Sequence, residues 1–346
     1  MIFFDTTKTG GASHRSGLNR VSTKLRAALG TAATASGWDQ PTRSVLTIAG
    51  TTPYAGDWFV TSELFSEAER PGFGAWLDAR PLRCAAIYHD AIPLKHPHIT
   101  WPQSVARHPA YLKQLARFDR VWAVSQASRD ELLGFWRWQG IATPPPVDVI
   151  PLGADFCAAP RVTSRAVQPA PRLLCVGILE PRKNHAFLLE VCAELWAEGL
   201  ALELDLVGRV NPHFGRPIVA RIQELRRTYG DRLRWHEGAD DAQLGSLFRA
   251  ARASVFPTIA EGCGLPLLES LWLGVPCVHS DLPVLRENSG GGGCLPVAVN
   301  DRRAWMDALR EVATNDTLVA QLTDGATRRA LPTWRETAAT LTTALV

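Results

Sequence analysis

Residues 257–269 read Pro257-Thr258-Ile259-Ala260-Glu261-Gly262-Cys263-Gly264-Leu265-Pro266-Leu267-Leu268-Glu269. The apolar run Ala253–Phe256 just before them is typical of a buried strand, and the apolar residues after Gly264 predict a helix that begins near Leu265. Pro266 suits the first turn of that helix, where its missing N–H costs nothing. A strand, a glycine turn and a helix in this order predict a parallel sheet covered by helices.

The same alternation of strand and helix continues along the rest of the chain. The strands that we expect are Ile2–Phe4, Val45–Ala49, Ala85–Tyr88, Val121–Val124 and Val147–Ile150, then Leu173–Val176, Leu202–Val207, Leu233–Trp235, Ala253–Phe256 and Cys277–His279. Residues 157–170 (CAAPRVTSRAVQPA) have the composition of a linker. We therefore predict an α/β fold of two Rossmann-like parallel-sheet domains facing a cleft, over residues 1–156 and 171–333, with a C-terminal helix over 334–346 that packs back on the first domain.

Composition and charge exclude several classes of protein. The chain has 346 residues, enough for two domains, and a net charge of +3 without a Lys/Arg run of the nucleic-acid-binding type. Its seven cysteines form no CxxC pair and predict reduced core residues in a cytoplasmic protein. No apolar stretch is long enough to span a bilayer, which leaves peripheral membrane contact open. No D-x-D occurs, so we expect neither a metal nor another cofactor.

Two carboxylates flank the glycine turn of the opening segment. Glu261 precedes the expected helix and Glu269 lies beyond its first turn. Carboxylates accept hydrogen bonds from hydroxyls, such as those of a sugar or a ribose. Free N–H groups at Gly264 and Leu265 would form an anion site beside them. Acidic residues placed for the helix dipole are the alternative, but that reading explains Glu269 poorly.

A pair of cations follows the first strand of the second half. Arg182 and Lys183 lie in the segment Val176-Gly177-Ile178-Leu179-Glu180-Pro181-Arg182-Lys183-Asn184. Two cations at a strand end could stabilise a diphosphate without a metal, and a pair of solvated surface bases is the alternative. Arg209, after the next strand, is a further candidate for a nucleotide contact.

These motifs resemble those of the family 4 retaining glycosyltransferases, which have the two-domain architecture called GT-B. Their E-x7-E motif reads EGFGLP-x-x-E, and this chain matches it except for Cys263 where Phe is common. Their phosphate loop usually reads V-G-R-L-x-x-x-K-G, from which Ile178 and Asn184 depart. The variant Glu180–Asn184 (EPRKN) resembles the subset that contains bacterial mannosyl- and rhamnosyltransferases.

The resemblance implies a role for each of these residues. Glu261, with Gly262, Cys263 and Gly264, would contact the donor sugar, and Glu269 the ribose. Arg182 and Lys183 would bind the donor diphosphate together with Gly264 and Leu265, with Arg182 supplying the guanidinium that Ile178 replaces.

The first domain contributes two further candidates. His89 and Asp90 end the expected strand Ala85–Tyr88, and the family has a similar H-D-x-x-P whose His contacts the donor sugar. Without the resemblance, a buried structural His89 is an equal reading, and Asp90 could be a base or orient His89. The loop Thr9–Asn19 resembles the family's glycine-rich loop, in which Gly10 and Gly11 would approach the diphosphate, and a plain flexible loop is an equal reading.

The resemblance therefore predicts a retaining, metal-independent hexosyltransferase. The first domain would bind the acceptor and the second a GDP-, UDP- or dTDP-sugar, and the hexose that we expect is mannose from GDP-mannose. The acceptor would be a glycan or a lipid-linked glycan at the inner face of the cytoplasmic membrane. A nucleotide-sugar epimerase and a non-catalytic sugar-nucleotide-binding subunit are the alternatives.

Overall fold

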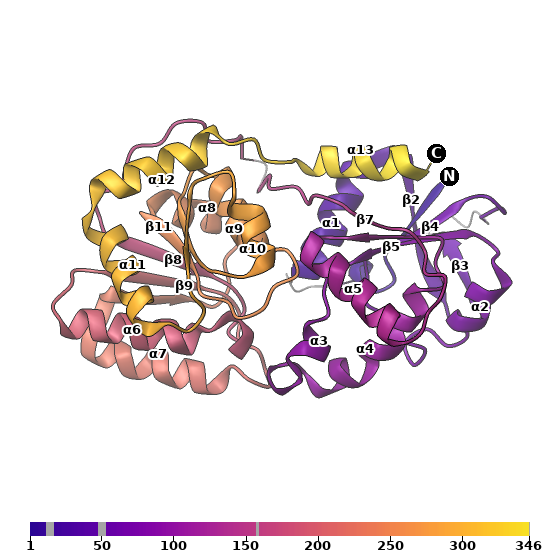
Figure 1. The fold of residues 1–346 in the computed structure, drawn as a ribbon, viewed down its shortest axis with the longest axis horizontal. Coiled ribbons are helices and arrows are strands. Elements are labelled where there is room, and N and C mark those ends of the chain that lie inside the picture. Colours follow the sequence, from indigo (N-terminus) through magenta and orange to yellow (C-terminus); the bar gives the residue numbers. More distant parts are fainter. Residues whose placement is uncertain (12–16, 48–52, 157–158, 346) are drawn as a thin grey trace. The chain divides into compact units, whose positions relative to one another are not determined.

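The computed structural model describes residues 1–11, 17–47, 53–156 and 159–345. The chain divides into two compact units, one built from Met1–Gly153 with Pro332–Val346 and the other from Ala154–Leu331 (Figure 1). Parts of the glycine-rich loop (12–16) and of the linker (157–158, with Cys157) lie outside the described residues, as do Ile48 and Ala49 of an expected strand and Val346 of the expected C-terminal helix.

Unit 1 is built on a seven-stranded sheet with the order β3-β2-β1-β4-β5-β6-β7. Its strands are β1 (Ile2–Asp5), β2 (Ala33–Asp39), β3 (Ser44–Thr47), β4 (Trp58–Thr61), β5 (Arg83–Tyr88), β6 (Arg120–Ala123) and β7 (Val147–Val149). The strands run parallel except β3, which pairs antiparallel with β2.

The expectation of a parallel strand at Val45–Ala49 was wrong. Strand β3 is an antiparallel edge strand, since the four residues between β2 and β3 allow a hairpin but not a crossover. Strands β2 and β4 were not predicted. The sequence of β2 (ATASGWD) carries few apolar residues, and β4 has only four residues, so neither makes a clear pattern.

Helices cover both faces of the sheet in unit 1. They are α1 (Gly17–Leu29), α2 (Phe73–Ala79), α3 (Ile92–Lys95), α4 (Pro102–Leu115), α5 (Gln126–Trp138) and α13 (Trp334–Leu345), with short 3-10 turns at Thr9–Gly11, Gly30–Ala32 and Pro97–Ile99. Helix α13 returns from the far end of the chain and packs beside α1 (Figure 1). The Thr337 hydroxyl donates to the Pro151 carbonyl, which ties α13 to the segment that follows β7.

Unit 2 has a six-stranded parallel sheet with the order β10-β9-β8-β11-β12-β13. Its strands are β8 (Arg172–Val176), β9 (Glu203–Val207), β10 (Leu233–His236), β11 (Ala253–Phe256), β12 (Cys277–Ser280) and β13 (Cys294–Val297). From β8, successive strands are added on one side up to β10, and from β11 they are added on the other side, so the order of the strands reverses between β8 and β11. Ligands of open α/β sheets bind beyond the carboxyl ends of the strands at such a switch point.

The helices of unit 2 sandwich this sheet. They are α6 (His185–Ala197), α7 (Arg216–Tyr229), α8 (Asp241–Ala250), α9 (Leu265–Trp272), α10 (Pro283–Ser289), α11 (Arg302–Thr314) and α12 (Asp316–Arg328), with 3-10 turns at Pro181–Lys183 and Gly230–Arg232. Leu173 and Cys175 of β8 join the core formed with α6, α7 and α11. The alternate residues Leu174 and Val176 face α8 and α9, so both faces of the strand are apolar, as a buried parallel strand requires.

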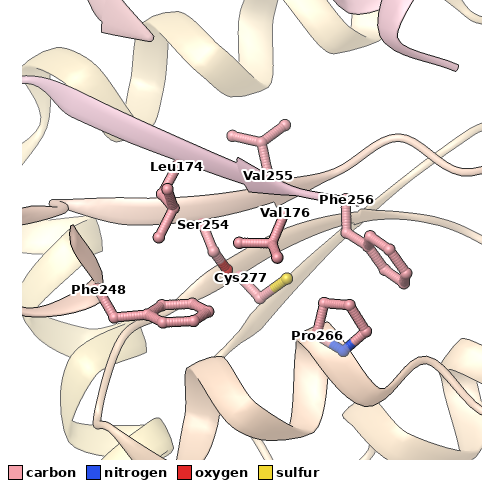
Figure 2. A pocket seen from close by; sticks show the side chains of 8 residues that line it. All are labelled: Leu174, Val176, Phe248, Ser254, Val255, Phe256, Pro266 and Cys277. Carbon is pink, nitrogen blue, oxygen red and sulfur yellow. The ribbon is translucent and has the colours of Figure 1, made fainter. Parts of the chain in front are cut away.

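A small void lies between this second face and the helices α8 and α9. Figure 2 shows Phe248 and Pro266 on one side and the strand residues Leu174, Val176 and Cys277 on the other. Its volume is about 10 Å³, room for one water at most. It is therefore a packing defect beneath the start of α9 and not a ligand pocket.

Candidate functional site

The turn between β11 and α9 has a backbone that only glycine allows. Gly264 precedes α9 with a φ of 88°, in the left-handed region. A Cβ at this position would lie 2.4 Å from Leu285 Cδ2. Among the described residues, the N–H groups of Gly264 and Leu265 have no hydrogen-bond partner. The start of α9 therefore presents free donors at the carboxyl end of the sheet.

Glu261 is the centre of a charged cluster beside this turn. Its Oε1 accepts from Lys183 Nζ at 2.5 Å, from Arg182 Nη1 at 3.0 Å and from Thr258 Oγ1 at 2.9 Å. The three donors converge on one carboxylate oxygen, and Oε2 has no hydrogen-bond partner among the described residues. Glu261 can therefore accept a further hydrogen bond through Oε2 without losing any that it has.

The cations keep the Glu261 carboxylate ionised. Burial by itself would raise the pKa of Glu261, but the charges of Lys183 and Arg182 and the hydrogen bonds from Lys183 and Thr258 outweigh burial, so that the pKa lies below its usual value. Burial lowers the pKa of Lys183, against the attraction of Glu261. The Lys183 ammonium also lies 4.8 Å from the centre of the Phe256 ring, a cation–π contact.

Arg182 joins two loops that follow adjacent strands. Its Nε and Nη2 donate to Glu180 Oε1 at 3.1 and 2.8 Å, and its Nη1 donates to the Ala260 carbonyl at 3.0 Å as well as to Glu261. Two acids and two bases thus lie together, and their charges cancel. The guanidinium holds the β8–α6 loop against the β11–α9 loop, a tie between loops that the sequence did not indicate.

The other candidates in unit 2 lie around this cluster in different settings. Glu269 is on the second turn of α9 and is buried. Cys263 is buried and faces α10, because Asn288 Nδ2 donates to its carbonyl at 2.7 Å and approaches its Sγ at 3.7 Å. Arg209 follows β9, and its carbonyl accepts from the N–H of Leu179 at 2.9 Å.

An open hollow lies at the carboxyl end of β10, and sequence reasoning missed it. Its volume is about 490 Å³, and its lining comes from the β10–α8 loop and from α8: His236, Gly238, Ala239, Ala242, Gln243, Ser246 and Leu247. His236 Nε2 lies 2.9 Å from Asp205 Oδ1, which fixes the imidazole at the edge of the hollow. The only signal in the sequence was the glycine that follows a strand at Gly238.

In unit 1, the structure places His89 and Asp90 directly after β5. His89 Nε2 lies 2.8 Å from the Ser62 carbonyl, and since a carbonyl only accepts, Nε2 carries the hydrogen. Burial lowers the pKa of His89, against the Ser62 hydrogen bond and the charge of Asp90. Asp90 Oδ1 accepts from the N–H of Ile92 at 3.0 Å and so shapes the turn into α3.

The glycine-rich loop is held by acids that the sequence did not single out. Glu63 accepts from the N–H groups of Lys8 and Thr9 at 2.8 to 3.0 Å. Arg70, whose side chain is 0% exposed, donates to Glu63 at 2.7 Å and to Asp5 at 2.6 Å. No local pattern marks these three side chains, because they come from three segments that meet only in the folded chain.

Some N–H groups of this loop already donate hydrogen bonds to other atoms of the protein. The N–H of Gly10 donates to the Thr6 carbonyl at 2.9 Å, so it cannot also bind a phosphate. Of the two glycines that we expected to approach the diphosphate, we therefore propose this contact for Gly11 only. The residues that follow it, 12–16, lie outside the described residues.

Among the described residues, no three His, Cys, Asp or Glu side chains are grouped to hold a metal ion. Within the same residues, no helix has the length and apolar character needed to cross a membrane.

Comparisons with known sequences point to one family. Residues 170–315 match the family model described as Glycosyl transferases group 1. The chain is 31% identical over 221 residues to the serotype-specific mannosyltransferase WbdA of Escherichia coli, which covers 58% of this chain and 26% of that protein. It is 28% identical over 213 residues to the O-antigen chain mannosyltransferase B of Escherichia coli, covering 56% of this chain and 54% of the relative. The chain thus spans about a quarter of the first relative and about half of the second.

Solved structures agree on the fold. A sucrose-phosphate synthase from Thermosynechococcus elongatus superimposes with a TM-score of 0.72 at 17% identity, over 99% of this chain and 97% of the other. HepE of Anabaena, solved in complex with UDP and glucose, gives 0.71 at 12% identity over 99% of each chain. The expected fold of two parallel-sheet α/β domains is confirmed. Residues 170–315, which include the E-x7-E turn after β11, are thus similar to group 1 glycosyltransferases, and the chain shares the two-domain fold of the solved structures.

Proposed function

We propose that this protein transfers a hexosyl group from a nucleotide sugar to a glycan or lipid-linked glycan, with retention of configuration and without a metal. The observation that carries the proposal is the state of Glu261, whose Oε1 is held by Lys183, Arg182 and Thr258, while Oε2 has no partner in the part of the chain that the structure describes. A carboxylate fixed in this way at the carboxyl end of β11 is suited to accept a hydrogen bond from a sugar hydroxyl.

The residues around Glu261 have the chemistry that a nucleotide diphosphate needs. The free N–H groups of Gly264 and Leu265 can donate to phosphate oxygens. Lys183 can turn from Glu261 to a diphosphate and neutralise the charge that grows as the diphosphate leaves. Arg182, already bonded to both Glu180 and Glu261, acts in this proposal mainly by holding the two loops together.

The nucleoside would occupy the rest of this sheet edge. We propose that Glu269 binds the ribose and that the hollow of about 490 Å³ at the end of β10 holds the base. A pocket with apolar walls and a few polar groups is typical for a flat ring. We also propose that Arg209, which follows β9, contacts the nucleotide.

In the transfer step, the bond from C1 of the sugar to the diphosphate oxygen breaks, and a bond from C1 to the acceptor oxygen forms on the same face. The proton of the acceptor hydroxyl passes to the departing phosphate oxygen, so no residue has to take it. His89, neutral and with its hydrogen on Nε2, offers Nδ1 as an acceptor for a hydroxyl of the donor sugar. Asp90 holds the turn that presents His89.

Mannose from GDP-mannose is the donor that we propose first. It is supported by the names of the two curated relatives described above, which are mannosyltransferases. The O-antigen relative supports a glycan acceptor. We place the reaction at the cytoplasmic side of the membrane, with peripheral contact to a lipid-linked acceptor.

A thermal-shift panel of GDP-, UDP-, dTDP- and ADP-sugars tests the donor site. A donor at about 100 times its Kd adds about 2.7 kcal/mol to the stability of the native state and raises Tm. We expect the largest shift with GDP-mannose, and a much smaller shift in Glu261→Gln. The matched control is Glu224→Gln, which changes an exposed carboxylate on α7. If no member of the panel raises the Tm of the wild type, the donor site is wrong, and an epimerised donor formed without any acceptor would indicate an epimerase.

A further inference from the structure

The His89–Asp90 turn is held by side chains from two helices that follow it in the chain. The carbonyls of both residues accept side-chain hydrogen bonds, each from a different helix. Buried carbonyls nearly always have a hydrogen-bond partner, and here the partners of two successive carbonyls are side chains of two different helices.

The first donor is His108, on the buried side of α4. Its Nε2 lies 3.0 Å from the Asp90 carbonyl and must carry the hydrogen, since the carbonyl only accepts. The residue is 4% exposed. Burial lowers the pKa of His108, against the charge and the hydrogen bond of Asp90, so the ring acts as a neutral donor.

The second donor is Ser128, in the first turn of α5. Its hydroxyl donates to the His89 carbonyl at 2.8 Å. Ser125 caps the same helix: its Oγ accepts from the N–H of Ser128 at 3.0 Å, and its hydroxyl donates to Ser128 Oγ at 3.0 Å. The cap of α5 and the His89 carbonyl are therefore joined by one chain of hydroxyls.

With the His89 ring bonded to Ser62, the turn is fixed from three elements. The end of β4 holds the imidazole, α5 holds the His89 carbonyl, and α4 holds the Asp90 carbonyl. Without these two donors the carbonyls would lose their hydrogen-bond partners, and of these three contacts only that of the His89 ring would still hold the turn.

We propose that His108 and Ser128 are positioning residues, which hold the two successive carbonyls of the His89–Asp90 turn and so fix His89 for the transfer step. The proposal rests on the proposed function, because it assumes that His89 contacts the donor sugar. Small displacements of a positioned group lower the rate of the chemical step, whereas binding of the nucleotide depends on residues of unit 2.

The test compares kcat and the donor KM of His108→Phe, His108→Gln, Ser128→Ala and Ser128→Thr in the full chain. His108→Phe removes the donor and keeps the ring, and we expect kcat to fall about 10- to 100-fold with the donor KM within about 2-fold. His108→Gln places an N–H near the position of Nε2 and should restore kcat to within about 3-fold of the wild type. Ser128→Ala should lower kcat in the same way, and Ser128→Thr should restore it.

Tyr111→Phe is the matched control on the same helix. Tyr111 is buried on α4, its ring lies 5.5 Å from that of His108, and its hydroxyl has no hydrogen-bond partner within the described ranges of the chain. We expect this variant to keep the kcat of the wild type. Far-UV circular dichroism and Tm establish which variants fold, and Ser128→Ala decides the question if His108→Phe does not fold.

The outcomes separate the two proposals. If the wild type transfers sugar, and His108→Phe and Ser128→Ala both keep the kcat of Tyr111→Phe, the positioning role alone is overturned. A loss of kcat that His108→Gln and Ser128→Thr do not restore would also overturn it, because the loss would then come from packing. A wild type that transfers sugar from no nucleotide sugar would overturn the proposed function and this inference with it.

Discussion

At the scale of single residues, the buried charges are the least tolerant part of the molecule. Arg70 is fully buried between Asp5 and Glu63 and lies over the rings of Phe65 and Phe73. A buried ion pair adds little stability compared with apolar side chains of the same volume. Removing one partner, however, leaves an uncompensated charge in a medium of low polarity. The same holds for Lys183 and Glu261 in unit 2.

We expect Arg70→Met to lower the free energy of unfolding of unit 1 by about 3–5 kcal/mol, because Asp5 and Glu63 would be left without their cation. Urea unfolding measures the change. The control is Arg80→Met, whose exposed pair with Asp119 should contribute no more than about 1 kcal/mol. Equal effects of the two substitutions would contradict this account of the cluster.

The Glu261 cluster predicts a pH dependence. The pKa of Glu261 is lower in the folded chain than its ordinary value of 4.5, so the ionised carboxylate stabilises the fold above that value, and this contribution is lost as the pH falls through the folded pKa. Glu261→Gln should therefore cost most at pH 7, where Lys183 would lose its counterion, and progressively less below about pH 4.5. Unfolding of both proteins by denaturant between pH 3 and 7 measures the difference, and a difference that grows on acidification would rule out this assignment.

At the scale of elements, the turns that end the strands decide where the chemistry lies. The β11–α9 turn depends on the left-handed backbone of Gly264 and on its close approach to Leu285. The helix start could be predicted from sequence because a strand, a glycine and a proline follow one another within a few residues. The hairpin of β2 and β3 could not be predicted, because the sequence of a short, weakly apolar strand does not indicate whether it pairs parallel or antiparallel.

We expect Gly264→Ala to destabilise unit 2 by about 1–3 kcal/mol, because an L side chain in this backbone conformation is strained and its Cβ would meet Leu285. Gly134→Ala in the middle of α5 is the matched control. A Cβ at Gly134 meets nothing within 4 Å, and alanine there should stabilise by about 0.5–1 kcal/mol. Thermal unfolding of both variants checks the opposite signs, and a neutral Gly264→Ala would contradict the argument.

At the scale of the whole molecule, each unit has its own sheet and core, and the chain end belongs to the first. Helix α13 buries Trp334, Ala338 and Leu341 in unit 1, and Thr337 bonds to Pro151. The structural units thus differ from a simple division of the sequence into halves, because the last residues, 332–346, join the unit that begins the chain.

Truncation after Leu331 should therefore destabilise unit 1 and leave unit 2 unchanged. Loss of α13 exposes the face of α1 against which it packs. Hydrogen exchange measured by mass spectrometry should show faster exchange in α1 and β1 and unaltered exchange in α6 and β8. Equal acceleration in both units would show that α13 supports the chain as a whole.

The sequence alone determined the features that arise from neighbours in the chain. These are the alternation of strands and helices, the glycine turn before Leu265, and the positions of Glu261, Lys183 and His89 at the ends of strands. Local backbone preferences and the period of apolar residues act over a few residues, so they can be read directly.

Only the tertiary structure decided which of these side chains bond to one another. Arg182 and Lys183 lie 79 and 78 residues from Glu261 in sequence, and nothing local shows that they share its Oε1. Nor does any pattern show that His108 reaches the Asp90 carbonyl, or that Arg70 holds the acid beneath the glycine-rich loop. Such contacts follow from the order of strands in the sheets and from the packing of helices on them, which bring distant residues to one edge where a buried charge or carbonyl must find a partner.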